Sequence, residues 1–353
     1  MGRVASDSVL LRTEGRAARI TLDRPAALNA LTRPMVRAMD AALAAWEGDP
    51  AVGVVVVAGA GERGLCAGGD IRAFHADAVS GGRGTLGFWR DEYRLNARIA
   101  RFRKPYVALM DGIVMGGGVG ISAHGGVRVV TERSAVAMPE TGIGFVPDVG
   151  GTYLLARAPG ELGTHLALTG LPVGAADAVL CGLADHYVPS ARLAGFAAAL
   201  ADGGVADVVA RYAEPAPAGE LAAHRGWIDH CYAGGSVEGI VERLLAHGDP
   251  AAKEAARTIL TRSPTALKVT LAAVRRAREL GTLEQVLEQE YRVSCAAFAG
   301  PDLVEGIRAR VIDKDGAPRW SPAALAEVSD ADVARFFARR DGNSAAGGAL
   351  FGR

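Results

Sequence analysis

A run of β-branched residues near the start of the chain limits the folds that are open to it. Residues 52–58, bounded by Pro50 and Gly59, are mostly valine, which is typical of a parallel strand that is buried on both faces. Strand-like segments at 18–22, 106–110, 127–130 and 135–138 alternate with helical patterns at 32–46, 90–102 and 116–124. Parallel strands need crossover connections, so this order predicts an α/β core.

The character of the sequence changes after about residue 147, where alanine-rich helical segments begin to dominate. Two helices are predicted at 265–280 and 282–298, because the apolar residues of each fall on one face. We therefore expect four consecutive segments. They are a core with the site at 1–190, a variable helical segment at 191–262, a C-terminal helical region at 263–340 and a frayed tail at 341–353.

Charge and cysteine content exclude several classes of protein. The 353 residues include 39 Lys plus Arg and 39 Asp plus Glu, and this balance argues against a nucleic-acid partner. The four cysteines show no CxxC spacing and the seven histidines no metal-ligand spacing, which predicts neither a disulfide framework nor a metal site. No signal-peptide pattern and no apolar run of about 18 residues is visible. We expect a cytoplasmic protein without a membrane partner.

Two glycine clusters stand after predicted strands. They are residues 66–70 (Cys-Ala-Gly-Gly-Asp) and residues 115–120 (Met-Gly-Gly-Gly-Val-Gly). Glycine lets backbone N–H groups approach a ligand closely, so two such corners could supply two donors to one oxygen, as in an oxyanion hole. Tight turns or close packing are the plainer interpretation of each cluster alone. Residues 118–123 also fit a GxGxxG/A dinucleotide pattern, although strands and helices precede it, whereas that fingerprint normally sits in the first βα turn.

Three carboxylates draw attention for different reasons. Glu140 follows an apolar strand among apolar neighbours, where desolvation would raise its pKa and make it a better base or nucleophile. Asp148 follows apolar residues and is followed by Val149 and two glycines. It could be a site residue, or it could equally be the N-cap of the helix that follows. Glu92 stands in a helix with other charges around it, so its pattern alone predicts a solvated face.

Several motifs, taken in order, resemble the crotonase superfamily, which includes the enoyl-CoA hydratases and isomerases. They are Arg24-Pro25 with residues 28–31 (Leu-Asn-Ala-Leu), residues 66–71 (Cys-Ala-Gly-Gly-Asp-Ile) and residues 115–118 (Met-Gly-Gly-Gly). Residues 137–141 with 147–151, 263–268, and 305–308 with 312–315 narrow the resemblance to the 3-hydroxyisobutyryl-CoA hydrolase branch. The similarity runs from about residue 9 to about residue 337, and it is weakest between about 191 and 262.

This resemblance implies a spiral of ββα turns closed by a C-terminal helical region. It implies that the N–H groups of Gly69 and Gly117 hold a thioester oxygen. It also implies that Glu140 and Asp148 are catalytic or substrate-contacting carboxylates, and that Glu92 contacts the substrate, against the pattern-based expectation for that residue.

The resemblance extends to the binding of coenzyme A. Leu28, Ala67 and Ile71 are expected along the CoA moiety of the substrate, together with Gly69. CoA would be part of an acyl-CoA substrate, so no separate cofactor is expected. The family often forms trimers or dimers of trimers, which implies a homo-oligomer.

One departure from the family pattern bears on the reaction. Hydratases of this family carry two glutamates that hold one water, and the first stands three residues after the middle glycine of the triplet, where this chain has Gly120. A lone Glu140 beside a polarised thioester suits hydrolysis of a short-chain 3-hydroxyacyl-CoA, as in valine catabolism, by direct attack or through an activated water. Three alternatives stay open: an enoyl-CoA isomerase or hydratase, a non-catalytic acyl-CoA binder and a dinucleotide oxidoreductase.

Overall fold

The computed structural model describes residues 8–338 and 350–351 of the chain. The chain divides into two compact units whose segments interleave. The first comprises the described residues of Met1–Gly69, Arg94–Ala137 and Val173–Gly219, and the second those of Asp70–Tyr93, Met138–Pro172 and Glu220–Arg353. The four consecutive segments expected from the sequence follow chain order and stay a prediction. The expected tail, 341–353, lies outside the described residues apart from Leu350 and Phe351.

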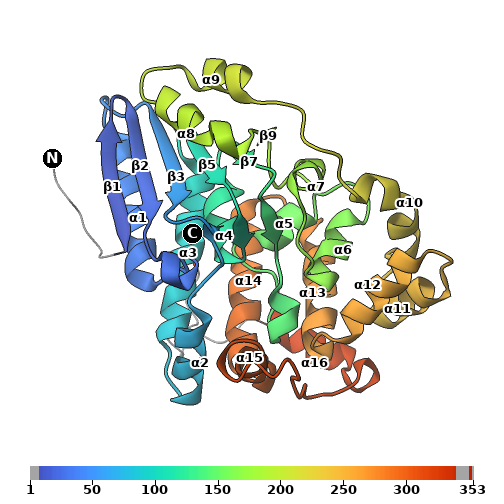
Figure 1. The fold of residues 1–353 in the computed structure, drawn as a ribbon. Helices are drawn as coiled ribbons and strands as arrows, with labels where there is room; N and C mark the ends of the chain where they lie inside the picture. Colours follow the sequence, from blue (N-terminus) through green and yellow to red (C-terminus); the bar gives the residue numbers. More distant parts are fainter. Residues whose placement is uncertain (1–7, 339–349, 352–353) are drawn as a thin grey trace. The chain divides into compact units, whose positions relative to one another are not determined.

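The described part of the first unit contains a six-stranded and a three-stranded sheet (Figure 1). The larger sheet has the order β1-β2-β3-β5-β7-β9, in which β1 and β2 are antiparallel and the other neighbours are parallel. Its strands are β1 Val9–Glu14, β2 Ala17–Leu22, β3 Val54–Gly59, β5 Tyr106–Met110, β7 Val127–Val130 and β9 His186–Tyr187. The smaller sheet joins β4 Gly64–Cys66, β6 Ile113–Met115 and β8 Ala135–Ala137, all in parallel.

The valine run forms the middle of this unit because side chains on both faces of β3 are buried. Val54 and Val56 point to the face covered by α8 (Ser190–Ala199) and α9 (Val205–Tyr212), where they pack with Phe196 and other apolar residues. Val55 and Val57, on the opposite face, are also fully buried. Full burial of a valine side chain contributes roughly 1.5–3 kcal/mol, which explains the absence of polar residues from this strand.

The strands repeat in pairs that confirm the predicted ββα spiral. β3, β5 and β7 each enter the large sheet, and the strand that follows each of them, β4, β6 or β8, enters the small one. The sequence did not reveal β4 or β6, because three-residue strands leave almost no periodicity to detect. It also missed β1, whose outward residues are largely exposed and charged, as is common at the edge of a sheet.

Helices of the first unit pack beside its sheets, and one of them, α4, begins at the second glycine cluster. They are α1 Arg33–Glu47, α4 Gly117–Ser122 and α7 Ala175–Leu180, besides α8 and α9. α3, Gly84–Arg101, belongs in part to each unit, since the boundary falls between Tyr93 and Arg94.

The second unit is helical in its described residues, in agreement with the predicted C-terminal helical region. Its helices are α2 Ile71–Val79, α5 Gly151–Leu155, α6 Leu162–Thr169, α10 Leu221–Cys231, α11 Val237–Ala246, α12 Pro250–Leu260, α13 Pro264–Ala277, α14 Leu283–Phe298, α15 Pro301–Ile307 and α16 Asp330–Phe337. The predicted pair at 265–280 and 282–298 corresponds to α13 and α14. α14 begins with a capping box, in which Thr282 and Gln285 satisfy each other's backbone N–H.

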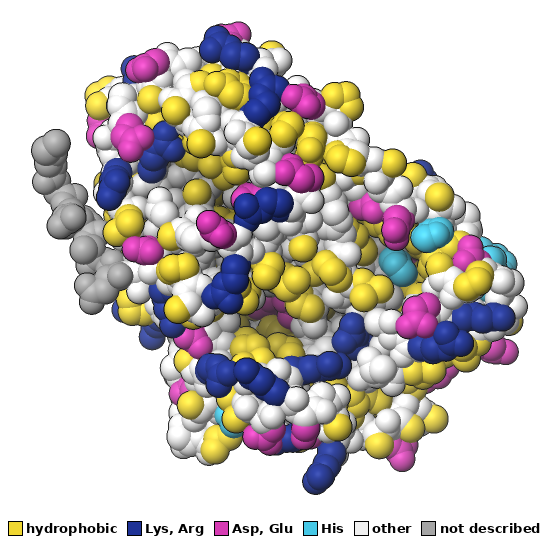
Figure 2. All heavy atoms as spheres, viewed as in Figure 1, with side chains coloured by type: hydrophobic (Ala, Val, Ile, Leu, Met, Phe, Trp, Pro, Cys, Tyr) yellow, Lys and Arg dark blue, Asp and Glu magenta, His cyan; other side chains and the backbone are white. Residues whose placement is uncertain are grey.

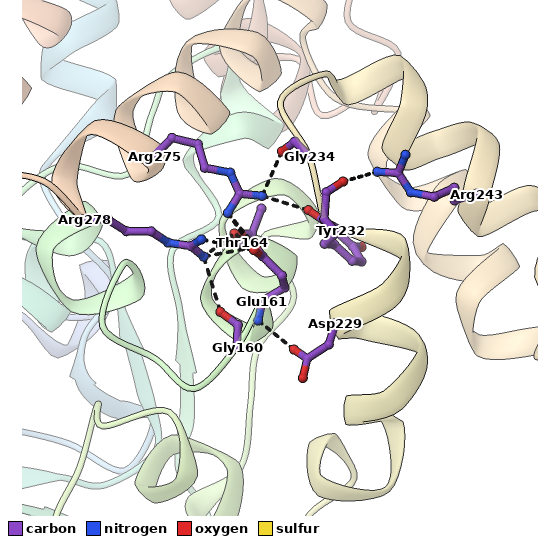
Figure 3. Close-up of polar contacts among 10 residues, drawn as sticks. Gly160, Glu161, Thr164, Asp229, Tyr232, Gly234, Arg243, Arg275 and Arg278 are labelled. Atoms are coloured by element: carbon purple, nitrogen blue, oxygen red, sulfur yellow. Dashed lines mark hydrogen bonds and ion pairs between the residues drawn. The ribbon is translucent and has the colours of Figure 1, made fainter.

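A cluster of ionic contacts joins three helices of this unit (Figure 3). Glu161, just before α6, accepts hydrogen bonds from Arg275 of α13 and from Arg278. Arg275 also donates to the carbonyl of Tyr232, at the end of α10, at 2.8 Å. One carboxylate thus joins segments that lie more than 110 residues apart in the chain.

The surface carries charges of both signs. On the face drawn in Figure 2, Lys and Arg side chains are interspersed with Asp and Glu over much of the surface, and several lie side by side in its lower part. No helix within the described residues is long and apolar enough to cross a membrane.

Candidate active site

The two glycine clusters form neighbouring corners at the ends of β4 and β6. Parallel pairing sets Cys66 opposite Val114, so the chain turns at adjacent positions after each strand. A Cβ atom on Gly118 would lie 2.3 Å from the carbonyl oxygen of Cys66, so the second corner approaches the first more closely than any other residue would allow. Gly68 (φ 108°) and Gly116 (φ 50°) use backbone conformations that disfavour side chains.

Backbone donors are free at these corners. Gly117 is buried and is the first residue of α4, where an N–H has no partner within the helix. In the part of the chain that the structure describes, no hydrogen bond occupies the N–H of Gly69 or of Gly117. A Cβ atom placed on Gly68 would lie 3.6 Å from the nitrogen of Gly117, so the two corners are close together.

Leu28 and Ala67, two of the residues expected along CoA, contact each other at the first glycine cluster. The N–H of Ala67 donates to the carbonyl of Leu28 at 3.0 Å, and the N–H of Leu31 donates to Gly68 at 2.8 Å. Leu28 adopts a left-handed conformation (φ 52°) that ends a short 3-10 turn. The structure therefore brings these two segments together, although the bonded residues are 37 and 39 positions apart in sequence. Ile71 begins α2, directly after this corner.

Four buried carboxylates gather in the second unit. Their side chains belong to residues that are all less than a tenth exposed: Glu92, Glu140, Asp148 and Glu290. One oxygen of Glu140 and one of Glu92 are buried without any hydrogen-bond partner among the described residues. Unpaired buried carboxylate oxygens are costly and mark sites that a ligand or water completes.

The burial of Glu92 corrects the expectation drawn from its charged neighbours. Glu92 lies on the inner side of α3, 2% exposed. The pattern-based prediction of a solvated face is wrong, and the burial agrees with what the family resemblance implied. Charged neighbours on a helix occupy different faces, so their presence in the sequence says little about one residue.

The charges of these carboxylates act on one another. Burial raises the pKa of Glu140 well above its usual range, and the charge of Asp148 raises it further. Burial also raises the pKa of Glu92, with Asp148 and Glu140 adding to the effect. Burial raises the pKa of Asp148 to about 7 and that of Glu290 to about 8, although hydrogen bonds to both carboxylates act in the opposite direction. Burial and mutual repulsion therefore disfavour the charged form of each of these carboxylates.

Asp148 is held by Tyr93 and does not cap a helix. The Tyr93 hydroxyl donates to Oδ2 of Asp148 at 2.7 Å and lies 2.8 Å from Oγ of Ser294. α5 starts at Gly151 with Gly150 at its N-cap position, so the alternative interpretation of Asp148 as a helix cap is wrong.

Segments near the C-terminus hold the turn that carries Glu140. This residue opens a 3-10 turn, Glu140–Ile143. A Cβ atom on Gly306 of α15 would lie 2.3 Å from the carbonyl of Ile143, and the N–H of Ser263 donates to the carbonyl of Thr141. The motif residue Arg308 pairs with Glu305, Asp313 and Asp315. Gly306 and Ser263 therefore contact the turn directly, and the ion pairs of Arg308 join the residues around Gly306 to one another.

Aromatic rings pack beside the same segments. Trp89 of α3 stacks on Phe145 with centroids 5.1 Å apart, and it meets Phe298 of α14 edge-on at 5.8 Å. Phe74 and Phe88 extend this cluster. Phe145 lies between Glu140 and Asp148 in sequence, so the rings keep water from a segment that carries two carboxylates.

Three residues of the cluster were not anticipated from sequence: Tyr93, Glu290 and Ser294. A signal existed for two of them. Glu290 and Ser294 continue the apolar stripe of α14 marked by Leu283 and Leu287, and a polar residue on the buried stripe of an amphipathic helix is unusual. Tyr93 offers no comparable signal, because a buried tyrosine is common.

The ββα spiral of the first unit, with N–H donors at its glycine corners, and the desolvated carboxylates of the second unit are features typical of enzymes that act on acyl thioesters. The chain belongs to the enoyl-CoA hydratase/isomerase family, whose model matches residues 17–337. It is 42% identical over 355 residues to a protein of Danio rerio described as "3-hydroxyisobutyryl-CoA hydrolase, mitochondrial", covering 97% of this chain and 92% of that one.

Solved structures agree with the fold. A carnitinyl-CoA dehydratase of Mycobacterium thermoresistibile is 56% identical with a TM-score of 0.93, and the match covers 95% of this chain and 98% of that one. An enoyl-CoA hydratase of Rhodobacter sphaeroides is 46% identical with a TM-score of 0.89, over 94% and 97% of the two chains. The descriptions of these relatives name three different reactions.

Proposed function

We propose that this chain hydrolyses a short-chain 3-hydroxyacyl-CoA thioester, converting 3-hydroxyisobutyryl-CoA and water to 3-hydroxyisobutyrate and CoA. The observation that carries the proposal is the burial of Glu140 with an unpartnered oxygen, three residues after β8. Membership of an acyl-CoA family and the hydrolase description of a relative support it. In a cell this reaction would serve valine catabolism.

In the proposed mechanism, Glu140 attacks the thioester carbonyl or activates a water that does. The N–H groups of Gly69 and Gly117 stabilise the negative oxygen that develops, and such a donor is worth about 10²–10³ in rate. The carbon–sulfur bond then breaks and the CoA thiolate takes up a proton. If Glu140 attacks directly, water cleaves the resulting anhydride and restores the carboxylate.

The neighbouring carboxylates have separate parts in this proposal. Asp148 accepts a hydrogen bond from the 3-hydroxyl of the acyl group, since Tyr93 occupies only its Oδ2. Glu92 contacts the substrate beside it. Leu28, Ala67 and Ile71 lie along the CoA moiety.

Gly120 favours hydrolysis over the hydratase reaction named for one solved relative. This position is a glycine inside α4, with no side chain to hold a second carboxylate. Addition of water to a double bond in this family uses two glutamates on one water, whereas acyl transfer to water needs one carboxylate and an oxyanion site. Hydration is therefore a second candidate. Isomerisation is another, because it can use a lone glutamate, but Asp148 and the C-terminal motifs favour hydrolysis.

Glu140→Gln tests the proposal. It keeps the shape of the side chain but removes the nucleophile or base, so release of free thiol from 3-hydroxyisobutyryl-CoA should fall by at least about 10³. Glu288→Gln, a charge change on the partly exposed side of α14, is the matched control and should keep full activity. Substantial thiol release by Glu140→Gln would refute the role of Glu140. Enoyl thioester formed by the unaltered protein without thiol release would favour the second candidates.

We also propose that no cofactor is needed beyond the CoA of the substrate, and that the protein is a trimer or hexamer. A cytoplasmic location stays a prediction, and the Danio rerio relative is described as mitochondrial.

A further inference from the structure

We infer that Ser294 and Glu290, one turn apart on α14, are positioning residues that fix Asp148 for recognition of the substrate's 3-hydroxyl. This inference rests on the proposed role of Asp148 as the acceptor of that hydroxyl. The two residues act through different groups: Ser294 through Tyr93, and Glu290 through the backbone that follows Asp148.

Ser294 reaches Asp148 through a chain of two hydrogen bonds. Tyr93 donates its single hydroxyl hydrogen to Oδ2 of Asp148. Its oxygen can then only accept, so Ser294 Oγ, 2.8 Å away, is the donor of the second bond. All three side chains are buried. The chain fixes the rotation of the carboxylate and leaves Oδ1 for the ligand.

Glu290 holds the strained turn that follows Asp148. Val149 has φ of 54° and Gly150 has φ of 79°, and a left-handed conformation is unfavourable for a β-branched residue. The carboxylate of Glu290 accepts from the N–H of Gly150 at 2.6 Å and from the N–H and hydroxyl of Thr152 at 2.9 and 2.5 Å. Such a turn persists only when its surroundings impose it, and these three bonds do so.

The spacing of the two anchors explains why one helix serves both. Positions four apart on a helix lie on the same face, so one face of α14 presents Ser294 to Tyr93 and Glu290 to the turn that follows Asp148. Glu290 is 1% exposed, and both of its oxygens accept hydrogen bonds from donors of this turn. Its contacts are therefore with the backbone and side chain that follow Asp148, which is the role of a positioning residue.

A binding ratio tests the inference without depending on turnover. In a Glu140→Gln background, the affinities for 3-hydroxyisobutyryl-CoA and isobutyryl-CoA are measured by calorimetry, and their ratio reports the hydroxyl contact alone. Ser294→Ala should reduce this preference for the hydroxylated ligand by roughly tenfold, and Glu290→Gln by at least as much. In each variant Asp148 is less well placed to accept a hydrogen bond from the 3-hydroxyl of the ligand. Affinity for isobutyryl-CoA should change little.

Matched controls separate positioning from general damage. Thr270→Val removes a buried hydroxyl of α13 that has no hydrogen-bond partner among the described residues, and Glu288→Gln alters a charge on α14; both should keep the ratio. Glu290→Asp, which retains an acceptor of the same charge, should recover part of it. An unchanged ratio in folded Ser294→Ala and Glu290→Gln would overturn the inference. Absence of thiol release by the unaltered protein would instead refute the proposed hydrolysis, and the binding ratio would still test the positioning.

Discussion

Among single residues, Tyr93 has the clearest effect on the site, because its hydrogen bond lowers the pKa of Asp148 against the effect of burial. Burial raises the pKa of Asp148 to about 7, and the hydrogen bond from Tyr93 is the main effect that opposes the rise. The side chain is therefore poised to change charge near neutral pH. An ionised Asp148 is the better acceptor for a hydroxyl, so affinity for a hydroxylated substrate should increase as pH rises through about 7.

Tyr93→Phe should move this dependence to higher pH. Loss of the donor makes the ionised carboxylate less stable, so the midpoint of kcat/KM against pH for 3-hydroxyisobutyryl-CoA should rise by roughly one pH unit. Tyr232→Phe is the control, because it removes a buried hydroxyl that contacts His165 in the same unit. An equal shift in both variants would show that the effect is not specific to Asp148.

At the scale of elements, the ion cluster of Figure 3 joins α6, α10 and α13 in the second unit. Burial alone would raise the pKa of Glu161, but hydrogen bonds from Arg278, Thr164 and Arg275 outweigh it and lower the pKa below its usual value. Its side chain is only 14% exposed. The ion pairs of Glu161 with Arg275 and Arg278 are therefore less exposed to solvent than a surface ion pair, which contributes about 0–1 kcal/mol.

Glu161→Gln should destabilise the protein by about 1–3 kcal/mol, because two arginines lose their charged acceptor. Denaturant unfolding followed by tryptophan fluorescence measures this change. Glu254→Gln breaks an exposed pair with Arg257 and should cost less than about 1 kcal/mol. Equal effects of the two substitutions would contradict the importance assigned to the cluster.

At the scale of the whole molecule, the buried carboxylates should make stability depend on pH. The pKa of Asp148 rises from 3.8 to about 7 on folding and that of Glu290 from 4.5 to about 8, so the folded protein binds protons more tightly. Their contribution is fully present below the unfolded-state values and is lost as pH rises through about 7 and 8. Glu161 acts oppositely, because its contribution is lost as pH falls below about 4.5.

The free energy of unfolding should therefore decrease between about pH 5 and pH 8 in the protein without substrate. Denaturant titrations at several pH values measure the slope. Asp148→Asn combined with Glu290→Gln removes both titrating groups and should flatten it, whereas Glu288→Gln should not. A slope that is the same in the double variant would place the responsible groups elsewhere.

Local patterns in the chain were sufficient to predict several helices and strands and to locate the glycine corners. The valine run, the strands at 106–110 and 127–130, and the paired helices α13 and α14 follow from periodicity and from Gly and Pro positions, which depend only on neighbours in the chain. Motif order also indicated the family, Glu140 and Asp148. β4 and β6 were not predicted, because three residues leave almost no periodicity to detect.

The environment of the carboxylates depends on packing between distant segments and could not be predicted from local patterns. Glu92 is buried because segments distant in sequence cover one face of α3. Asp148 accepts a hydrogen bond from Tyr93, 55 residues away, and Tyr93 in turn contacts Ser294 of α14. Glu290, more than 140 residues from Asp148, contacts the turn that follows it. Desolvation and charge proximity depend on which surfaces pack together, and no local pattern contains that information.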